Sequence, residues 1–238
     1  MKKMRSEDFY NKESVKYDKL RLLGDGNSVN DILQKSTIND FLSDLDKDCK
    51  VLEIAPGTGR LTELLDNHFH DITAVDISSE MLKQLSAKNF SNKINLIHSD
   101  IVNYSTDKKF DLIFFINAAS HMEDFEKVCQ WCSKHLSKDG VVYFNFPNIF
   151  SIYFLPGLYV KLTNRSLLRN VFTRWYSTGE VSKIAKNYGL KTNRASGITH
   201  APLGTPRIIG KLMLFLNKFL KHFNYFFGSQ IFIKLNRP

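Results

Sequence analysis

The sequence predicts an α/β fold built on a doubly wound, mostly parallel sheet of seven strands. Over residues 50–146, short apolar segments with the length of buried strands alternate with segments of helical periodicity, a pattern typical of βαβ units in a parallel sheet. Two more strand-like segments follow near the end of the chain. The 238 residues are 43% hydrophobic and 24% charged, which is enough for one such domain with a complete core. We therefore expect residues 1–238 to form a single domain.

Each predicted strand is a short run of apolar or β-branched residues that ends at a turn or a polar residue. The first run, KVLEIA, stops at Pro56 and Gly57, and the second, DITAVDIS, stops where Ser78 or Ser79 caps a helix. The fifth strand begins at the turn of Gly140. The predicted strands cover residues 50–55, 71–78, 94–100, 110–119, 140–146, 191–198 and 230–236.

Segments with helical periodicity connect these strands. After the first strand, Leu61, Leu64, Leu65 and Phe69 repeat at the spacing of one helix face. Similar apolar repeats, with capping residues before them and glycine after them, mark the other connections. Connecting helices are predicted over residues 58–69, 78–90, 123–136 and 178–189.

Three further segments lie outside this alternation. Residues 6–45 are predicted to form two helices, so that residues 1–45 make an N-terminal cover over the top of the sheet. Residues 148–175 and 200–228 are rich in apolar and aromatic side chains. We expect these two segments to be helical insertions after the fifth and sixth strands.

Charge is divided unevenly along the chain, whose formal net charge is +9. Residues 1–150 hold 19 Lys and Arg against 23 Asp and Glu, whereas residues 151–238 hold 14 against 1. A basic, aromatic-rich last third favours contact with phosphate, anionic lipid or nucleic acid.

The cysteines and the N-terminal sequence favour a reducing, cytoplasmic location. No apolar segment follows the basic start MKKMRSEDFYNKES, as it would in a secretory signal, and no stretch has the ~20 uncharged apolar residues of a spanning helix. Three cysteines are too few for a disulfide framework. Cys129 and Cys132 form a C-x-x-C pair but share helical spacing with Leu136. We read them as part of a helix face and not as a zinc or redox site.

The turn after the first strand is the first candidate ligand site. In an open parallel sheet, ligands bind outside the carboxyl ends of the strands where the strand order reverses. Gly57 and Gly59 stand there, and glycine permits positive φ and close approach of a ligand to the main chain. Glu53 precedes the turn and repels the phosphate that a G-x-G-x-x-G turn would bind. The turn therefore favours a ligand with a cationic group.

Acidic residues also end the next two strands. Asp76 lies 23 residues after Glu53, where a carboxylate can accept both hydroxyls of a ribose. Asp100, after the third strand, is placed to accept from an adenine amino group, with Ile101 donating through its backbone N–H. Together the three carboxylates predict an adenosyl ligand that carries a positive charge.

The motifs that contain these residues resemble those of the class I S-adenosylmethionine-dependent methyltransferases. VLEIAPGTGR resembles the first motif of that family, AVDIS with SSEML the second, HSDIVNY the third, and LSKDGVVYFNF the region of the fifth strand. The resemblance covers about residues 49–147 and, more loosely, 176–238. It implies a Rossmann-like methyltransferase fold with an antiparallel last strand, methyltransferase activity, and S-adenosyl-L-methionine as the cofactor.

The resemblance also implies roles for individual residues. Ala55 stands where the family more often has glycine, and because a methyl group is small we expect crowding there and not loss of binding. The cofactor-binding residues implied are Glu53, Ala55, Gly57 and Gly59 near the methionine part, Asp76 at the ribose, Ile77 and Met81 beside the adenine, Asp100 and Ile101 at its polar edge, and Asn117 after the fourth strand.

Candidate residues for the acceptor side are fewer. His121 follows the fourth strand, and an imidazole suits general-base catalysis near neutral pH; the alternative is a histidine that orders the turn with Glu123 or Asp124. Tyr10 and Tyr17 are candidates for lining the acceptor pocket from above, with simple packing as the alternative. No cluster of His and carboxylates has metal-ligand spacing, so no metal is expected.

Residues 207–228, RIIGKLMLFLNKFLKHFNYFFG, combine a broad apolar face with a narrow lysine stripe. Such a helix suits peripheral contact with a membrane interface, and it equally suits a cover for the sheet, a homodimer contact or a roof over the acceptor site. Arg165, Arg169 and Arg174 are candidates for binding a phosphate of the acceptor, or only decorate a helix. The expected location is the cytoplasm, either free or at the inner face of a membrane.

The leading hypothesis is an enzyme that methylates O or N of a small-molecule or lipid-linked acceptor, with a saccharide intermediate as one candidate. An NAD-dependent oxidoreductase or epimerase is the alternative, because Tyr104 and Lys108 form the Y-x-x-x-K pair of short-chain dehydrogenases. That pair precedes the fourth strand, however, and G-x-G-x-x-G is missing. A non-catalytic S-adenosylmethionine-binding module is a third class. RNA is disfavoured as the acceptor because the insertion is too apolar for a solvated groove.

Overall fold

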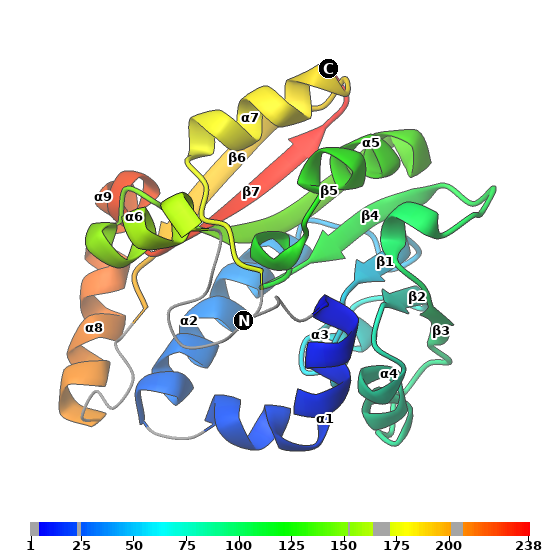
Figure 1. The fold of residues 1–238 in the computed structure, drawn as a ribbon, viewed down its shortest axis with the longest axis horizontal. Coiled ribbons are helices and arrows are strands. Elements are labelled where there is room, and N and C mark those ends of the chain that lie inside the picture. The colour runs from blue at the N-terminus through cyan, green and yellow to red at the C-terminus, as the bar shows by residue number, and fades with distance from the viewer. Residues whose placement is uncertain (1–4, 23–24, 152, 164–171, 201–206) are drawn as a thin grey trace.

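A seven-stranded sheet lies at the centre of the computed structural model, which describes residues 5–22, 25–151, 153–163, 172–200 and 207–238 (Figure 1). Hydrogen-bonded neighbours follow the order β3-β2-β1-β4-β5-β7-β6. Neighbours among β1 to β5 are parallel, and β7 is antiparallel to both β5 and β6. The predicted fold class is confirmed. The strands are β1 (Lys50–Ile54), β2 (Asp71–Asp76), β3 (Asn95–His98), β4 (Phe110–Phe115), β5 (Leu136–Pro147), β6 (Lys191–Ile198) and β7 (Gln230–Asn236).

Helices connect and cover the strands. α3, α4 and α5 connect successive parallel strands, α1 and α2 precede β1, and α6, α8 and α9 belong to the two segments predicted as insertions. The helices are α1 (Ser6–Leu22), α2 (Asp25–Leu42), α3 (Thr62–Asp66), α4 (Ser79–Ser86), α5 (Phe125–His135), α6 (Phe154–Thr163), α7 (Thr178–Asn187), α8 (Arg207–Phe219) and α9 (Lys221–Phe227), with short 3₁₀ helices η1 (Ile101–Asn103) and η2 (Ala119–His121).

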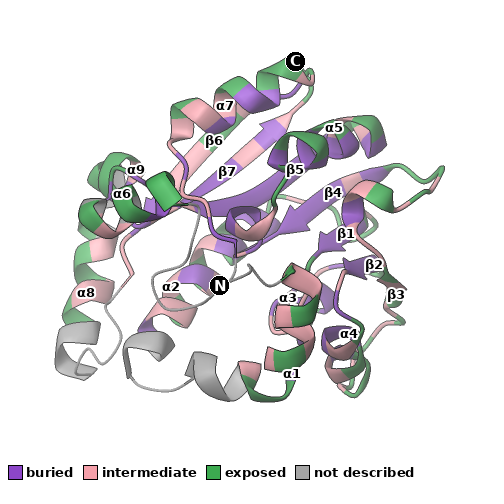
Figure 2. Ribbon diagram, viewed as in Figure 1, coloured by how far each residue is buried: buried purple, intermediate pink, exposed green. Residues whose placement is uncertain are grey.

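Two apolar layers cover the two faces of the sheet, which Figure 2 shows as largely buried. Side chains alternate along β4, so that Ile113 packs in the layer under α5 and α7 whereas Phe114 packs in the layer under α2 and α3. Both faces are covered, which explains why FDLIFF is apolar at nearly every position. Each fully buried side chain of this kind contributes roughly 1.5–3 kcal/mol to the hydrophobic stabilisation.

The strand order reverses between β1 and β4. Glu53 of β1 lies beside Ala74 of β2 on one side and Phe114 of β4 on the other. The connections from β1 and β4 therefore leave in opposite directions, and the carboxyl ends of these strands border a crevice.

Two boundaries differ from the prediction where the chain turns toward this crevice. β4 ends at Phe115 and not at residue 119, because Asn117 has a φ of +60° that is incompatible with a strand. The sequence stays apolar beyond the end of β4 because Ala118 and Ala119 are buried. α3 is limited to Thr62–Asp66, shorter than the predicted helix over residues 58–69, because the preceding turn has positive φ at Gly57 and Gly59.

A third boundary differs at the start of β5. This strand begins at Leu136, where Leu136 pairs with Phe110, and the register then shifts before the pairing of Leu112 with Val141. The predicted start at Gly140 is therefore wrong by four residues. Between these two pairs the strand is irregular and contains the polar residues 137–139. Their polarity made the sequence pattern predict a loop there.

The terminal helices are fixed to the body at different places. α1 packs against α4, α2 packs against α8, and α9 packs against β6. A Cβ at Gly197 of β6 would lie 1.7 Å from the carbonyl oxygen of Asn224 in α9, so this approach requires glycine. Of the three candidate phosphate ligands, Arg165 and Arg169 lie outside the described residues, and Arg174 pairs with Glu180.

Candidate active site

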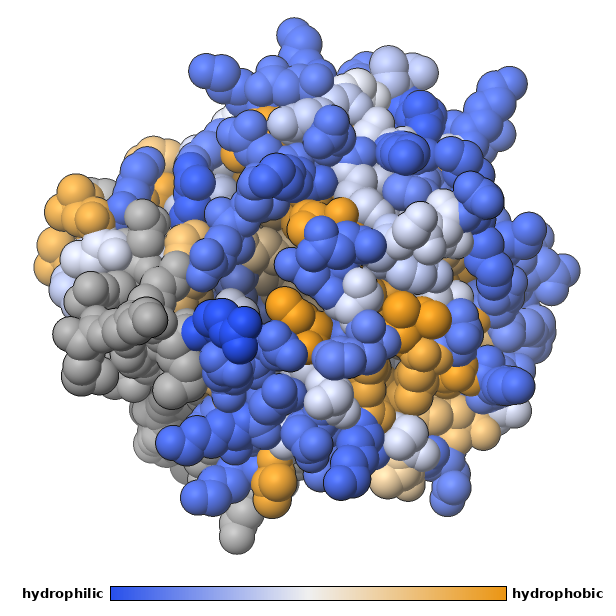
Figure 3. Space-filling view, turned by 45° about the vertical axis from the view of Figure 1, so that its right-hand side comes forward, coloured by the Kyte–Doolittle hydropathy of each residue, from blue (hydrophilic) through white to orange (hydrophobic). Residues whose placement is uncertain are grey.

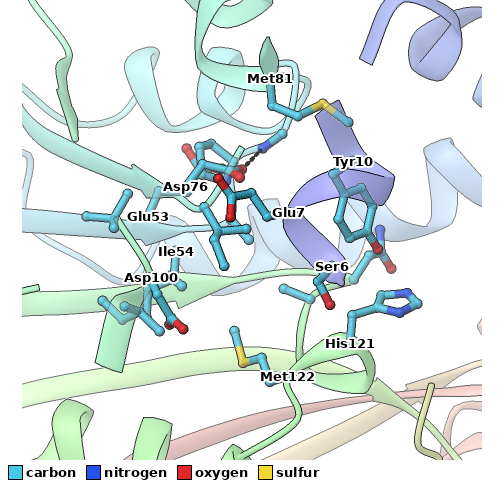
Figure 4. Close-up of a pocket in the computed structure, with 18 of the residues that line it drawn as sticks. Ser6, Glu7, Tyr10, Glu53, Ile54, Asp76, Met81, Asp100, His121 and Met122 are labelled. Carbon is cyan, nitrogen blue, oxygen red and sulfur yellow. Dashed lines mark hydrogen bonds between the residues drawn. The ribbon is translucent and has the colours of Figure 1, made fainter. Parts of the chain in front are cut away.

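A cavity of about 430 Å³ opens at the carboxyl ends of β1, β2 and β4, with α1 along one side (Figure 4). Figure 4 shows Glu53, Asp76 and Asp100 on one side of this cavity and Tyr10 and His121 on the other. The structure brings together, in its lining, all the sequence-predicted site residues except Gly59. They are Tyr10, Tyr17, Glu53, Ala55, Gly57, Asp76, Ile77, Met81, Asp100, Ile101, Asn117 and His121.

Glu53 lies within β1 and is 2% exposed. Thr62 Oγ1, from the first turn of α3, donates a hydrogen bond to Glu53 Oε2 at 2.6 Å. Burial raises the pKa of Glu53 to about 7, against the opposing effect of the Thr62 hydrogen bond. A carboxylate that is costly to ionise in the free protein gains most from a cationic ligand, because the ligand supplies the missing countercharge.

Asp76 ends β2 and is also buried, at 5% exposure. Its carboxylate accepts hydrogen bonds from the backbone N–H groups of Gly57, at 3.0 Å, and Ser78, at 2.8 Å. Burial raises the pKa of Asp76 to about 6, and these backbone hydrogen bonds oppose the shift. Asp76 therefore fixes the turn after β1 to the turn after β2.

Asp100 and Ile101 follow β3 at the same edge. Asp100 Oδ1 accepts from the backbone N–H of Val102 at 3.2 Å and caps η1. Both residues line the cavity together with Ile77 and Met81. Asp100 therefore caps η1 and also lines the cavity.

The turn after β1 uses its two glycines differently. Gly57, with φ +60°, lines the cavity. Gly59 lies outside the lining, and a Cβ there would lie 3.0 Å from the Leu85 side chain of α4. Close packing against Leu85 and the φ of +85° both account for a glycine at this position, and contact of Gly59 with the ligand stays a prediction. Ala55 also has positive φ, at +55°, so the departure from glycine there costs backbone energy and not only space.

Asn117 links the cavity to α2 and β5. Its side chain pairs with Gln34 of α2 at 3.1 and 3.3 Å. The side chain of Asn145 in β5 accepts from the backbone N–H of Asn117 at 2.6 Å and donates to its Oδ1 at 3.2 Å. Arg60, which lines the cavity, bonds to both Asp31 and Gln34 of α2. These bonds hold the left-handed backbone of Asn117 in place.

His121 ends η2 on the far side of the cavity. Its Nδ1 lies 2.9 Å from the carbonyl oxygen of Phe172, and because a carbonyl only accepts, Nδ1 carries the proton. The neutral tautomer with this bond has its lone pair on Nε2. The ring of Tyr10 packs edge-on against the imidazole with centroids 5.9 Å apart, and Tyr17 lies 6.5 Å beyond Tyr10.

His121 thus bonds to Phe172, a residue far from it along the chain, and its role in ordering the turn stays a prediction. Asp124 instead caps α5 by accepting from the backbone N–H of Lys127 at 3.1 Å. Hydrogen bonding to Lys127 lowers the pKa of Asp124.

α1 is fixed over the cavity by Asn11. Asn11 Oδ1 accepts from Ser78 Oγ at 2.7 Å, and Ser78 Oγ in turn accepts from the backbone N–H of Met81 as the cap of α4. Ser6 and Glu7 at the start of α1 line the cavity, and Figure 4 shows the Glu7 carboxylate between its two sides.

Two other candidate chemistries lie away from the cavity. Cys129 and Cys132 are buried on α5, and burial raises the pKa of Cys129 to about 12, so these thiols are structural. Tyr104 stacks on Trp131 and does not line the cavity. Within the described residues, no group of three His, Cys, Asp or Glu side chains has the arrangement of a metal site.

A comparison with known families decides the classification. Residues 52–144, which include Glu53, Asp76 and Asp100, match the family described as methyltransferase domain. The chain contains a methyltransferase domain over these residues. The resemblance seen in the motifs is thus confirmed.

Curated relatives of this methyltransferase domain differ in the acceptors that their names give. The chain is 36% identical over 88 residues to the malonyl-[acyl-carrier protein] O-methyltransferase of Priestia megaterium, over 34% of this chain and 32% of that protein. It is 23% identical over 161 residues to the ubiquinone biosynthesis O-methyltransferase of Thiobacillus denitrificans, over 65% and 69%. It is 28% identical over 89 residues to the ribosomal RNA small subunit methyltransferase A of Metamycoplasma arthritidis, over 37% and 33%. The chain spans less than half the length of the malonyl relatives it matches, at 32%, 45% and 42%.

Solved structures share the fold of the methyltransferase domain over nearly the whole chain. The DhpI-SAH complex has a TM-score of 0.67 at 17% identity, with 97% of this chain and 94% of that chain covered. The magnesium protoporphyrin IX methyltransferase of Synechocystis PCC 6803 with bound SAH has a TM-score of 0.67 at 14% identity, with 98% of each covered. At these identities the likeness extends to the fold alone.

Sequence reasoning missed several residues that line the cavity of this methyltransferase domain. Ser6 and Glu7 read only as the capping and first-turn residues of a helix, and nothing in the sequence shows which cavity that helix crosses. Met122 reads as an apolar residue of a turn. Arg60 could have been predicted to line the cavity, because it follows Gly59 directly in the first motif.

Proposed function

We propose that the chain binds S-adenosyl-L-methionine and transfers its methyl group to O or N of a small-molecule or lipid-linked acceptor. The observation that carries this proposal is the convergence of Glu53, Asp76 and Asp100, from three successive strand ends, on one cavity with His121 at its other side. When bound, this cofactor supplies a methyl group on a positively charged sulfur, and its transfer leaves neutral S-adenosylhomocysteine.

The residues on the strand side bind the adenosyl and methionine parts. Asp76 accepts hydrogen bonds from the ribose hydroxyls, and Asp100 accepts from the adenine amino group, with Ile101 donating through its backbone. Glu53 and Glu7 provide negative charge for the sulfonium and ammonium groups. Arg60, held by Asp31, provides positive charge for the carboxylate of the methionine part. The raised pKa values of Glu53 and Asp76 support this assignment, since a cationic ligand stabilises their ionised forms.

The residues on the other side position and deprotonate the acceptor. For a hydroxyl acceptor, the His121 Nε2 lone pair would take the proton of the acceptor oxygen during methyl transfer. The bond from Nδ1 to the Phe172 carbonyl orients the ring for this step and stabilises the imidazolium that results. Tyr10 packs on the ring and limits its motion. Alignment of the nucleophile with the methyl group supplies most of the remaining rate.

The chemical character of the acceptor is narrowed by the charges in the cavity. Glu7, Glu123 and Asp124 all line it, so a neutral or cationic acceptor group fits better than a phosphate. Relatives named as O-methyltransferases of acyl-carrier and ubiquinone pathways support an oxygen acceptor. The relative named as a ribosomal RNA methyltransferase makes RNA the competing acceptor.

Isothermal calorimetry with S-adenosylmethionine, S-adenosylhomocysteine and NAD tests the donor site. We expect micromolar binding of the first two ligands and no binding of NAD. Tight NAD binding without binding of the methyl donor would instead favour the oxidoreductase alternative. Donor binding without release of S-adenosylhomocysteine in a broad acceptor screen would favour the non-catalytic binding module.

A further inference from the structure

The helices of the two insertions expose an apolar surface. Fifteen large apolar side chains are exposed among the described residues, and all except Val15 and Ile32 lie between Phe150 and Phe227. The exposed apolar side chains of α6, α8 and α9, hereafter the apolar surface, include Phe219 at 68% exposure. Such a concentration on one part of a protein marks an interaction site and not random exposure.

Polar residues help to hold α8 and α9 to the body. Asn217 Oδ1 accepts from the backbone N–H of Thr199 at 2.8 Å, and Thr199 Oγ1 donates to Asn224 Oδ1 at 2.8 Å. Asn224 is 2% exposed. On the outer side, the rings of Phe215 and Phe219 pack together with centroids 4.5 Å apart. The anchoring asparagines therefore fix these helices with their aromatic side chains directed outward.

Hydrogen bonds join the two insertions at the base of this surface. Asn148 Nδ2 donates to the carbonyl oxygen of Phe226 at 2.8 Å, and the Tyr153 hydroxyl donates to that of His200 at 3.0 Å. α6, α8 and α9 lie on the same side of the molecule in Figure 1, and α6 exposes Leu162 at 76%. Figure 3 shows apolar atoms reaching the surface at this left-hand edge, beside a face that is mostly hydrophilic.

The charge on the part of the chain that carries the apolar surface is almost entirely positive. Residues 151–238 contain 14 Lys and Arg and one acidic residue, Glu180, which is paired with Arg174. Lys161 of α6 and Lys211 of α8 are exposed beside the apolar side chains. In a symmetric dimer the same patch meets itself, so these like charges would repel each other. An anionic lipid surface complements them and accepts the aromatic and leucine side chains at its interface.

We propose that the apolar surface docks onto the interface of an anionic lipid bilayer. The phenylalanines of α8 and α9 insert at the level of the headgroups, and the surrounding lysines bind the anionic headgroups. No described helix is long and apolar enough to span a bilayer, so the contact lies in the plane of the interface.

Docking also relates the lipid to the cavity. The insertion that contains α6 continues to Phe172, whose carbonyl holds His121, and to Arg174, whose backbone N–H donates to the carbonyl of Ser120 at 2.8 Å. A lipid-linked acceptor would then approach the His121 side of the cavity. This consequence rests on the proposed function, whereas docking itself does not.

Flotation of the full chain with liposomes tests the docking. The probes are vesicles of phosphatidylcholine alone and vesicles with equal parts of phosphatidylglycerol and phosphatidylcholine. We expect the chain to float with the anionic vesicles and to bind the neutral ones at least roughly tenfold more weakly. The double variant Phe215→Ser/Phe219→Ser should lose at least roughly tenfold in binding, and so should Lys161→Glu/Lys211→Glu.

A matched control is Val15→Ser/Ile32→Ser, which removes two exposed apolar side chains from α1 and α2 and should bind vesicles like the unchanged chain. Circular dichroism shows that each variant is folded, and calorimetry with S-adenosylhomocysteine reports the donor site separately from docking. Light scattering gives the oligomeric state. An unchanged chain that binds neither kind of vesicle overturns the proposal, as does a dimer that Phe215→Ser/Phe219→Ser converts to a monomer without any vesicle binding.

Discussion

The donor cavity and the apolar surface are constructed in opposite ways. The cavity buries carboxylates on the strands of the sheet and raises the pKa of Glu53 and Asp76. The helices of the apolar surface instead bury Asn224 and expose phenylalanines. Acids predominate in residues 1–150 and bases in residues 151–238.

The two regions therefore suit two different kinds of ligand. A small cationic ligand binds to charges that are fixed on rigid strands, where burial strengthens each electrostatic interaction. An extended anionic surface binds to many side chains, each of which contributes little. If the two regions are independent, a change in one should leave the measurement that reports the other unchanged.

His121→Ala should give the largest effect. With a hydroxyl acceptor identified, kcat should fall by about 100-fold or more, because the general base is lost. Affinity for S-adenosylhomocysteine and vesicle binding should both stay unchanged. His70→Ala, at an exposed histidine, is the control and should keep its full kcat. Near-normal turnover of His121→Ala would show that the acceptor needs no base from this side chain.

Glu53→Gln should stabilise the free protein while it weakens donor binding. Burial raises the pKa of Glu53 from 4.5 to about 7, so the folded state holds this proton more tightly than the unfolded chain. Stability of the free protein therefore falls as the pH rises through this range, by on the order of 3 kcal/mol. Urea denaturation at about pH 5 and about pH 8 should show a smaller decline for Glu53→Gln than for the unchanged chain.

Glu63→Gln is the control for this comparison, because Glu63 is exposed and pairs with Lys88 at the surface. Its stability should follow the pH like the unchanged chain. A decline with pH that is equally steep in Glu53→Gln would mean that the buried carboxylate is not the cause.

Asp76→Asn should weaken binding of S-adenosylhomocysteine by ~2 kcal/mol, about thirtyfold, the scale of charge-assisted hydrogen bonds. Calorimetry measures this loss directly. Asp139→Asn, at an exposed aspartate of β5, should leave the affinity unchanged. Equal affinities for all three proteins would remove Asp76 from the ribose site. Loss of vesicle binding by Asp76→Asn would contradict the independence of the two regions.

Ala55→Gly should have the smallest effect, a gain of about 1 kcal/mol in unfolding free energy, because Ala55 has a φ of +55°. Urea denaturation checks it. Ala87→Gly is the matched control, since Ala87 has a φ of −78° and glycine there should destabilise the chain. Equal losses in both variants would show that the backbone at Ala55 is not strained.

The sheet and the strand side of the cavity were predictable because both depend on local patterns. Apolar runs with turn residues between them mark the strands, and Asp76 and Asp100 follow strands whose ends share one edge of a parallel sheet. The glycine turn at Gly57 is equally local. Where the prediction failed, as at Leu136 and Asn117, an irregular register or a left-handed residue changed an element boundary without moving the site.

The other side of the cavity and the apolar surface depend on contacts between distant segments. Nothing near Glu7 indicates that α1 crosses the strand ends, and the bond between His121 and Phe172 joins residues 51 positions apart. For α8, periodicity gives an apolar and a polar face but not which face is buried. Asn217 and Asn224 face the body because both side chains form hydrogen bonds with Thr199.

A crystal structure of the chain with S-adenosylhomocysteine tests the central claim most directly. We predict density for the ligand in the cavity, with the ribose hydroxyls on Asp76, the adenine amino group on Asp100, and the amino-acid part beside Gly57 and Glu53. Density for the ligand at another place, or an empty cavity at saturating ligand, would contradict the assignment of these three carboxylates to the donor.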